Sequence, residues 1–274
     1  MKSRYQDITL LRLDHPGAND LVYRMRRKFI ASRAREFALC KKEVPKIAYT
    51  NAEQKTWQLA TAKLATLHSK WACSTYLASK NKLSISVRQI PQLADISRKL
   101  FCETGFRLEP VEGLVDSKTF LSGLRKRVML TTQYVRHHSR PDYTPEPDII
   151  HELLGHAPML MDKEFAAFSE RIGRAAQKAA AQEIKMLENL YWFTVEFGLI
   201  REGKGVKAFG AGLLSSFGEL QNAFSGKPQL KLLNIKTILK TRYTYSQMQE
   251  ILFVIPSFRA LEQETERFLI YKKL

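Results

Sequence analysis

The sequence has few cysteines, no long apolar run and no apolar leader, and each shortage excludes a class of protein. Three cysteines, Cys40, Cys73 and Cys102, occur in 274 residues. Their wide spacing and odd number favour reduced thiols over a disulfide framework. No run of about 18 apolar residues is present, so no membrane span is expected. Residues 1–7 also lack the apolar stretch of a secretory signal. These absences predict a cytoplasmic protein.

Positive charge is in excess. The formal net charge is +17, and residues 1–50 hold 12 Lys/Arg against 5 Asp/Glu and so contribute +7 of it. Such an excess can mark contact with nucleic acid or an anionic membrane, and steep salt-dependent binding to DNA would support that alternative. No zinc finger, RNP motif or basic zipper accompanies the charge. We therefore interpret it as a solvated basic face and expect neither a nucleic-acid nor a membrane partner.

The spacing of apolar residues predicts a mostly helical chain. Trp57, Ala60 and Leu64 recur at helical spacing after Asn51, which we expect to cap a helix with Gln54 as its capping-box partner. Further helices are expected over 19–39, 96–104, 165–172, 175–197 and 257–272, and a strand over 128–135. The sequence shows no internal repeat or interdomain linker. We predict a mostly α fold with minor β structure, as a single domain over residues 1–274.

Two histidines stand where a metal could bind. The zinc-protease signature His-Glu-x-x-His places its histidines four residues apart, whereas His151 and His156 are five apart, roughly 140° around an ideal helix. Both can still bind one ion if His151 lies in a frayed first turn, after the helix-disfavouring Pro145 and Pro147. The alternatives are two histidines on an ordinary helix, or a zinc hydrolase with Glu152 as general base.

Glu196 is the candidate third ligand. It is the one carboxylate in the apolar run of residues 191–199. A buried ionised carboxylate is costly unless it is paired or binds a metal, although a helix salt bridge or a capping role would also explain it. Two imidazoles and one carboxylate form the facial set that holds non-haem Fe(II) with open coordination positions.

Several long segments, in one order, identify a family. The main segments are Thr144–Asp148, His151–His156, Tyr191–Gly198 and Gly210–Glu219, with further likeness at Asp14–Gly17, Thr56–Trp57, Ile90–Leu93 and Thr104–Arg107. Together they resemble the pterin-dependent aromatic amino acid hydroxylases, and most of all the animal-type catalytic domain. The likeness covers nearly the whole chain, and independent segments in the same order are more specific than any single motif.

The resemblance implies a reaction and a set of site residues. It implies that Fe(II) is bound by His151, His156 and Glu196, with Tyr191 close to the iron. Tetrahydrobiopterin and O2 are the implied partners of the iron, and the implied reaction hydroxylates the ring of a free aromatic amino acid. The implied pterin pocket consists of Gly113, Leu114, Val115, Ser117, Phe120 and Glu152. The implied amino-acid pocket consists of Arg136, Thr144, Pro147, Trp192, Phe197 and Ser215.

Departures from the family pattern affect specificity. Leu130 stands where the animal enzymes commonly have a histidine near the pterin, and Tyr245 occupies a position that varies with substrate. Trp192 resembles the phenylalanine and tyrosine types. We expect conversion of L-phenylalanine to L-tyrosine, with tryptophan 5-hydroxylase or tyrosine 3-hydroxylase activity as alternatives. We also expect no regulatory domain, no C-terminal tetramerisation arm, and a monomer or dimer.

Overall fold

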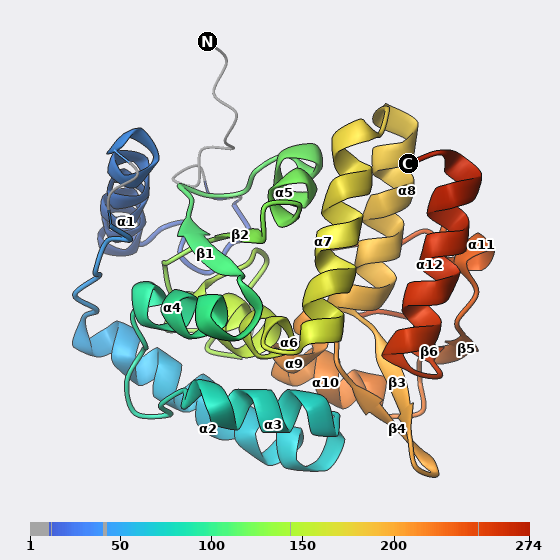
Figure 1. Ribbon diagram of the computed structural model, residues 1–274. Helices are drawn as coiled ribbons and strands as arrows, with labels where there is room; N and C mark the ends of the chain where they lie inside the picture. Colours follow the sequence, from blue (N-terminus) through green and yellow to red (C-terminus); the bar gives the residue numbers. More distant parts are fainter. Residues whose placement is uncertain (1–10, 12, 41–42, 143, 246) are drawn as a thin grey trace.

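The computed structural model describes residues 11, 13–40, 43–142, 144–245 and 247–274, and it confirms the predicted mostly helical fold with minor β structure (Figure 1). The α-helices are α1 (Leu21–Cys40), α2 (Asn51–Trp71), α3 (Ser74–Leu83), α4 (Leu93–Thr104), α5 (Ser117–Leu124), α6 (Ala157–Leu160), α7 (Lys163–Lys178), α8 (Ala181–Tyr191), α9 (Ala211–Leu214), α10 (Phe217–Ala223), α11 (Ile235–Ile238) and α12 (Phe258–Lys272). Two π-helical turns accompany them, η1 (His151–His156) and η2 (Trp192–Glu196). Among the described residues, no helix is long and apolar enough to cross a bilayer.

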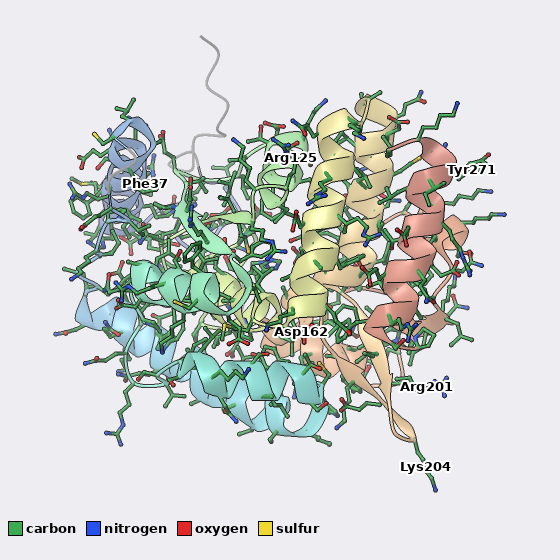
Figure 2. The ribbon with its side chains drawn as sticks, viewed as in Figure 1. Phe37, Arg125, Asp162, Arg201, Lys204 and Tyr271 are labelled. Carbon is green, nitrogen blue, oxygen red and sulfur yellow. The ribbon has the colours of Figure 1, made fainter. Side chains whose placement is uncertain are left out.

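Two small sheets complete the fold. The first pairs β1 (Arg107–Pro110) in parallel with β2 (Val128–Thr131). The second has the order β4-β3-β6-β5, from β3 (Leu199–Glu202), β4 (Gly205–Ala208), β5 (Gln229–Leu232) and β6 (Ile251–Ile255). Strands β3 and β4 form an antiparallel hairpin whose tip presents Lys204 away from the body of the protein (Figure 2). The expected strand over 128–135 is shorter than predicted, because it ends at Thr131.

Helix α2 shows how the local sequence sets an element. Its buried face is the predicted one, with Trp57, Ala60 and Leu64 all 3% exposed or less. The predicted cap was wrong by one residue. Thr50 is the N-cap, and its hydroxyl accepts a hydrogen bond from the Glu53 amide while the Glu53 carboxylate accepts one from the Thr50 amide. The capping box therefore uses Thr50 and Glu53 in place of Asn51 and Gln54.

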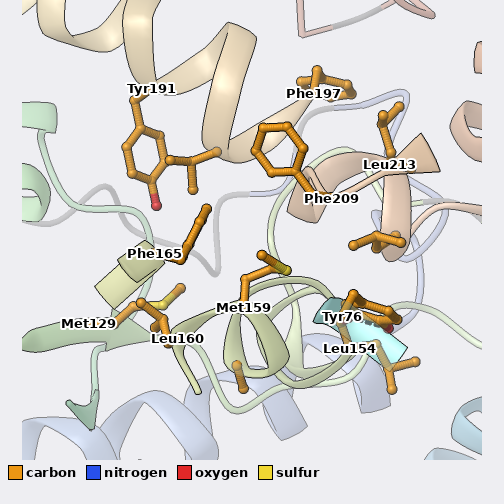
Figure 3. Packing of buried hydrophobic residues seen from close by; sticks show 14 of the residues in the cluster. Tyr76, Met129, Leu154, Met159, Leu160, Phe165, Tyr191, Phe197, Phe209 and Leu213 are labelled. Carbon is orange, nitrogen blue, oxygen red and sulfur yellow. Dashed lines mark hydrogen bonds between the residues drawn. The ribbon is translucent and has the colours of Figure 1, made fainter. Parts of the chain in front are cut away.

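The core lies between the long helices and the two π turns. Helices α7, α8 and α12 stand side by side along one side of the molecule (Figure 1). Phe165, Phe209 and Met159 fill the space beneath them, and Tyr191 extends into it from the end of α8 (Figure 3). Gly173 lets α5 approach α7, since a Cβ there would lie 2.2 Å from the backbone nitrogen of Arg125. This packing fixes the end of α8, where η2 begins.

Candidate active site

The turn from His151 to His156 is π-helical, which explains how two histidines five residues apart can share one face. The amide of Ala157 donates to the carbonyl of Glu152, five residues earlier. A π turn takes up more residues than an α turn, so side chains five apart come to one face, and the Nε2 atoms of His151 and His156 are 2.9 Å apart. Our expectation of a frayed first turn was wrong, since helical structure already begins at residue 149. The angle calculated for an ideal α-helix therefore does not apply.

Neighbouring groups hold this π turn in place. The Asp148 carboxylate accepts a hydrogen bond from the His151 amide at 3.0 Å and caps the start of the helix. Gly155 packs against α9, and a Cβ at this position would lie 2.7 Å from the Ala211 carbonyl oxygen. The turn is thus fixed at its start by a side-chain cap and near its end by backbone contact.

Glu196, at the end of η2, completes a cluster of three side chains. Its carboxylate oxygens lie 3.2 Å from His156 Nε2 and 3.6 Å from His151 Nε2. All three side chains are at most 14% exposed. The structure therefore brings together the three ligands expected from the sequence.

The spacing of these donor atoms fits a metal ion. Metal–ligand bonds of about 2.1 Å at right angles separate two donor atoms by about 3.0 Å. The three separations here run from 2.9 to 3.6 Å. Two imidazoles and a carboxylate on one face are the donor set of non-haem Fe(II) sites, with the remaining positions open. The residues present therefore fit an iron ion.

Ser215 sets the tautomer of His151. Its hydroxyl donates to the Ala211 carbonyl at 2.7 Å and lies 2.9 Å from His151 Nδ1. A hydroxyl has one proton to donate, so with that proton on Ala211 it accepts the Nδ1–H of His151. The Nε2 lone pair of His151 then faces Glu196 and His156. This is the arrangement by which an outer hydrogen bond orients a metal-binding imidazole.

A second carboxylate, Glu152, lies beside the cluster, within 4.8 Å of ligand atoms of both histidines. One of its oxygens accepts from the Thr132 amide at 3.1 Å and lies 3.2 Å from the Thr132 hydroxyl. Burial raises the pKa of Glu152 to about 7. Burial also acts to raise the pKa of Glu196, but the neighbouring His156 and His151 outweigh it and lower that pKa. The net pKa shifts of the two carboxylates therefore run in opposite directions.

The Arg136 side chain is buried and already paired. Its Nε and one terminal nitrogen donate to the two oxygens of Asp148, at 2.9 and 2.8 Å. The other terminal nitrogen, Nη1, has only long contacts, 3.3 Å to the Pro141 carbonyl and 3.5 Å to the Ser215 carbonyl. One edge of the guanidinium is thus used by the fold. The edge at Nη1 is the part of Arg136 left for a ligand.

Trp192 and Phe197 stand together beside Glu196, with ring centroids 4.6 Å apart. Two features there were missed from the sequence. Tyr243 stacks on Trp192 at 4.4 Å, and the Gln249 side-chain oxygen accepts from the Trp192 indole nitrogen at 2.9 Å. Gln249 comes 57 residues after Trp192, and no local pattern marks such a pairing. These contacts fix the orientation of the indole ring.

The other predicted amino-acid residues lie in the irregular approach to η1. The Thr144 hydroxyl donates to the Glu146 carbonyl at 2.7 Å. The Pro147 carbonyl accepts from the Thr132 hydroxyl at 3.0 Å. Because Thr132 also binds Glu152, one hydroxyl joins this approach to the carboxylate beside the metal cluster.

The predicted pterin residues lie in and after the loop before α5. Gly113 is buried, Leu114 is 38% exposed, and Val115 and Ser117 are half-buried. Phe120, in α5, meets Tyr191 edge-on at 5.6 Å. The Tyr191 ring in turn lies 6.3 Å from that of His156. Phe120 is therefore separated from His156 by one intervening ring, that of Tyr191.

Known proteins are similar to this chain in sequence. The family described as "Biopterin-dependent aromatic amino acid hydroxylase" matches residues 5–272. Phenylalanine-4-hydroxylase of Mus musculus is 45% identical over 259 residues, covering 93% of this chain and 57% of the relative. Tyrosine 3-monooxygenase of Schistosoma mansoni is 43% identical over 263 residues, covering 94% of this chain and 56% of the relative. The chain thus spans little more than half the length of these curated relatives.

A solved structure of a related enzyme has a similar fold. Phenylalanine hydroxylase of Chromobacterium violaceum, with bound iron(III) and 7,8-dihydrobiopterin, superposes with a TM-score of 0.77 at 32% identity, covering 82% of this chain and 83% of the other. The family match, over residues 5–272, includes the segments that form the two π turns. This chain belongs to the biopterin-dependent aromatic amino acid hydroxylase family.

Proposed function

We propose that this protein binds one Fe(II) through His151, His156 and Glu196, and uses tetrahydrobiopterin and O2 to hydroxylate the ring of a free aromatic amino acid. The observation behind this proposal is the convergence of three donor atoms within 2.9 to 3.6 Å on two π turns. When bound, the iron and the reduced pterin supply the activation of O2. The protein supplies position, polarity and exclusion of water.

Each remaining residue has a role that its surroundings support. Ser215 keeps the Nε2 lone pair of His151 directed at the metal position. Glu152 accepts hydrogen bonds from pterin N–H groups or holds a proton, as its raised pKa allows. Phe120 stacks on the pterin ring, and Tyr191 closes the buried side of the centre. The loop residues Gly113, Leu114, Val115 and Ser117 form the rest of the pterin pocket.

The amino acid is proposed to bind between two kinds of group. Arg136 Nη1 binds the substrate carboxylate, which suits its long remaining contacts in the free site. Trp192 and Phe197 contact the aromatic ring of the substrate. Thr144 and Pro147 shape the pocket between these two ends.

L-phenylalanine is the proposed substrate, and tyrosine 3-hydroxylation is the second candidate. Relatives named for each activity match this chain with similar identity, 45% and 43%. The test is a product assay with L-phenylalanine, L-tyrosine and L-tryptophan, after anaerobic loading with Fe(II). We expect pterin-dependent tyrosine formation from L-phenylalanine as the fastest reaction. Turnover supported by 2-oxoglutarate without pterin would contradict the proposal.

The iron assignment has its own test. Glu196→Gln keeps the size of the side chain but removes the negative charge, so we expect iron content per chain to fall strongly and turnover to cease. Glu264→Gln, on the exposed face of α12, is the matched control and should retain both. Full iron and activity in Glu196→Gln would remove this residue from the centre.

A further inference from the structure

A second cluster of metal-binding side chains lies apart from the proposed iron site. Ligand atoms of Asp20, His137 and His138 all lie within 4.8 Å of one another. None of these residues belongs to the iron ligand set. Among the described residues, this cluster and the one at His151 and His156 are the two groups of such spacing. The proposed hydroxylation does not use this second cluster.

Two of its donor atoms are already at metal-binding separation. Asp20 Oδ2 lies 3.2 Å from His137 Nε2. The other carboxylate oxygen, Oδ1, accepts the amide of Tyr23 at 2.9 Å and caps the start of α1. The cap thus fixes the carboxylate, and Oδ2 forms a hydrogen bond with His137 Nε2 that an ion between the two atoms would replace. Donors at the corners of a tetrahedron with bonds of about 2.1 Å are about 3.4 Å apart, close to the observed separation.

His137 is held in the orientation that such a site needs. Its Nδ1 lies 2.8 Å from the Ser139 hydroxyl, and the ring of Tyr23 packs edge-on against it at 4.9 Å. Metal-binding histidines are commonly oriented by a hydrogen bond at the second ring nitrogen. In the free site Nδ1 also accepts the Ser139 amide at 3.3 Å, and Nε2 is hydrogen-bonded to Asp20 Oδ2. A cation at Nε2 would therefore move the ring proton to Nδ1, where the Ser139 hydroxyl can accept it. Ser139 and Tyr23 thus position the His137 ring, and its Nε2 is paired with Asp20, the other proposed ligand.

His138 is the third member of the cluster, and its side chain is the exposed one. Its ring centroid is 4.2 Å from that of His137. Rotation of an exposed side chain can close the remaining distance without moving the backbone. Solvent access at the same side provides an entry path for the ion and water for a further coordination position.

We propose that Asp20, His137 and His138 form a second metal site, which takes a divalent transition ion such as Zn2+. Two imidazoles and one carboxylate are ligands that suit zinc. Occupancy joins the start of α1 to the segment that follows β2. Because His137 directly follows Arg136, the ion would lie one residue from the group proposed to bind the substrate carboxylate.

The test is a zinc titration of the chelator-treated full chain by calorimetry. Two variants remove one ligand each: His138→Ala changes an exposed side chain, and Asp20→Ser keeps an N-cap hydroxyl but removes the carboxylate. Asp95→Asn, an exposed acid on α4, is the control. We expect the wild type and the control to bind one more equivalent of Zn2+ than either variant, or the variants to bind it at least about tenfold more weakly.

The iron ligands can also take zinc, but they are unchanged in all four proteins. The difference between wild type and variants therefore reports only on the second site, whatever the iron test shows. A zinc-dependent rise in Tm that is smaller in His138→Ala than in the wild type would support the site independently. Equal stoichiometry and equal affinity in wild type, His138→Ala and Asp20→Ser would overturn the proposal.

Discussion

Asp148→Asn tests how far the buried pair with Arg136 stabilises the fold. The side chains of Arg136 and Asp148 are 2% and 0% exposed, and two hydrogen bonds join them. Burial alone would raise the pKa of Asp148, but the charge and hydrogen bonds of Arg136 outweigh it and hold the pKa below its usual value. Removing one partner of such a pair leaves a buried charge without compensation, which costs about 3–5 kcal/mol.

The expected loss lies near the lower end of that range. Asn keeps one acceptor oxygen for the guanidinium, so we expect the free energy of unfolding to fall by about 3 kcal/mol. For a chain of this size about 1 kcal/mol shifts Tm by about 2–4 °C, so Tm should fall by about 6–12 °C. Urea unfolding of chelator-treated protein, followed by circular dichroism, measures the change.

An exposed pair provides the control. Asp95 and Arg98 also form an ion pair, but their side chains are 53% and 71% exposed. Asp95→Asn should therefore cost about 0–1 kcal/mol. If Asp148→Asn lowered the free energy of unfolding no more than this control, burial would not make the Arg136–Asp148 pair more stabilising than an exposed pair. That result would refute the reasoning.

The buried Arg136–Asp148 pair also predicts that Arg136→Lys lowers both stability and kcat/KM, because lysine cannot form the two-point contact with Asp148. Unchanged stability and unchanged kcat/KM would contradict this. Burial raises the pKa of Glu219 to about 7, so the folded state holds this proton more tightly than the unfolded state and loses stability as pH rises from about 4.5 to 7. Glu219→Gln should therefore gain stability relative to wild type at pH 8 and not at pH 4.5, as urea unfolding at both pH values would show. Gly155→Ala places a Cβ 2.7 Å from the Ala211 carbonyl and should destabilise by about 1–3 kcal/mol, whereas Gly205→Ala, with 3.9 Å to its nearest neighbour, should not. Gln249→Leu should raise the amino-acid KM more than the pterin KM, and equal effects on both would count against its role in orienting Trp192.

The three residues proposed to bind iron stand out in the sequence because each lies in a short segment of unusual composition. His151 and His156 share one hexapeptide, and Glu196 is the one carboxylate in an apolar run. The helical character and the buried face of α2 were predictable for a similar reason, since apolar spacing is a local property.

What could not be predicted depends on backbone register and on contacts between distant residues. The cap is Thr50 because the helix begins at Asn51. Helix boundaries of this kind shift by one or two residues, so the sequence alone did not distinguish Thr50 from Asn51. The pairing of Gln249 with Trp192 joins two segments that meet only in the folded chain. The pairing with Asp148 likewise occupies one edge of the Arg136 guanidinium, which the sequence alone placed only in the implied amino-acid pocket.

The π turn at His151–His156 also has a consequence for how such sequences are compared. A π turn contains one more residue than the α turn it replaces. Deleting Leu154 would leave His-Glu-Leu-Gly-His, in which the histidines are four apart as in the zinc-protease signature. In an α-helix that shorter spacing again places both imidazoles on one face. An insertion or deletion of one residue can thus change helix type while preserving the approach of two ligands, so alignments scored on spacing alone would separate sites of equivalent geometry.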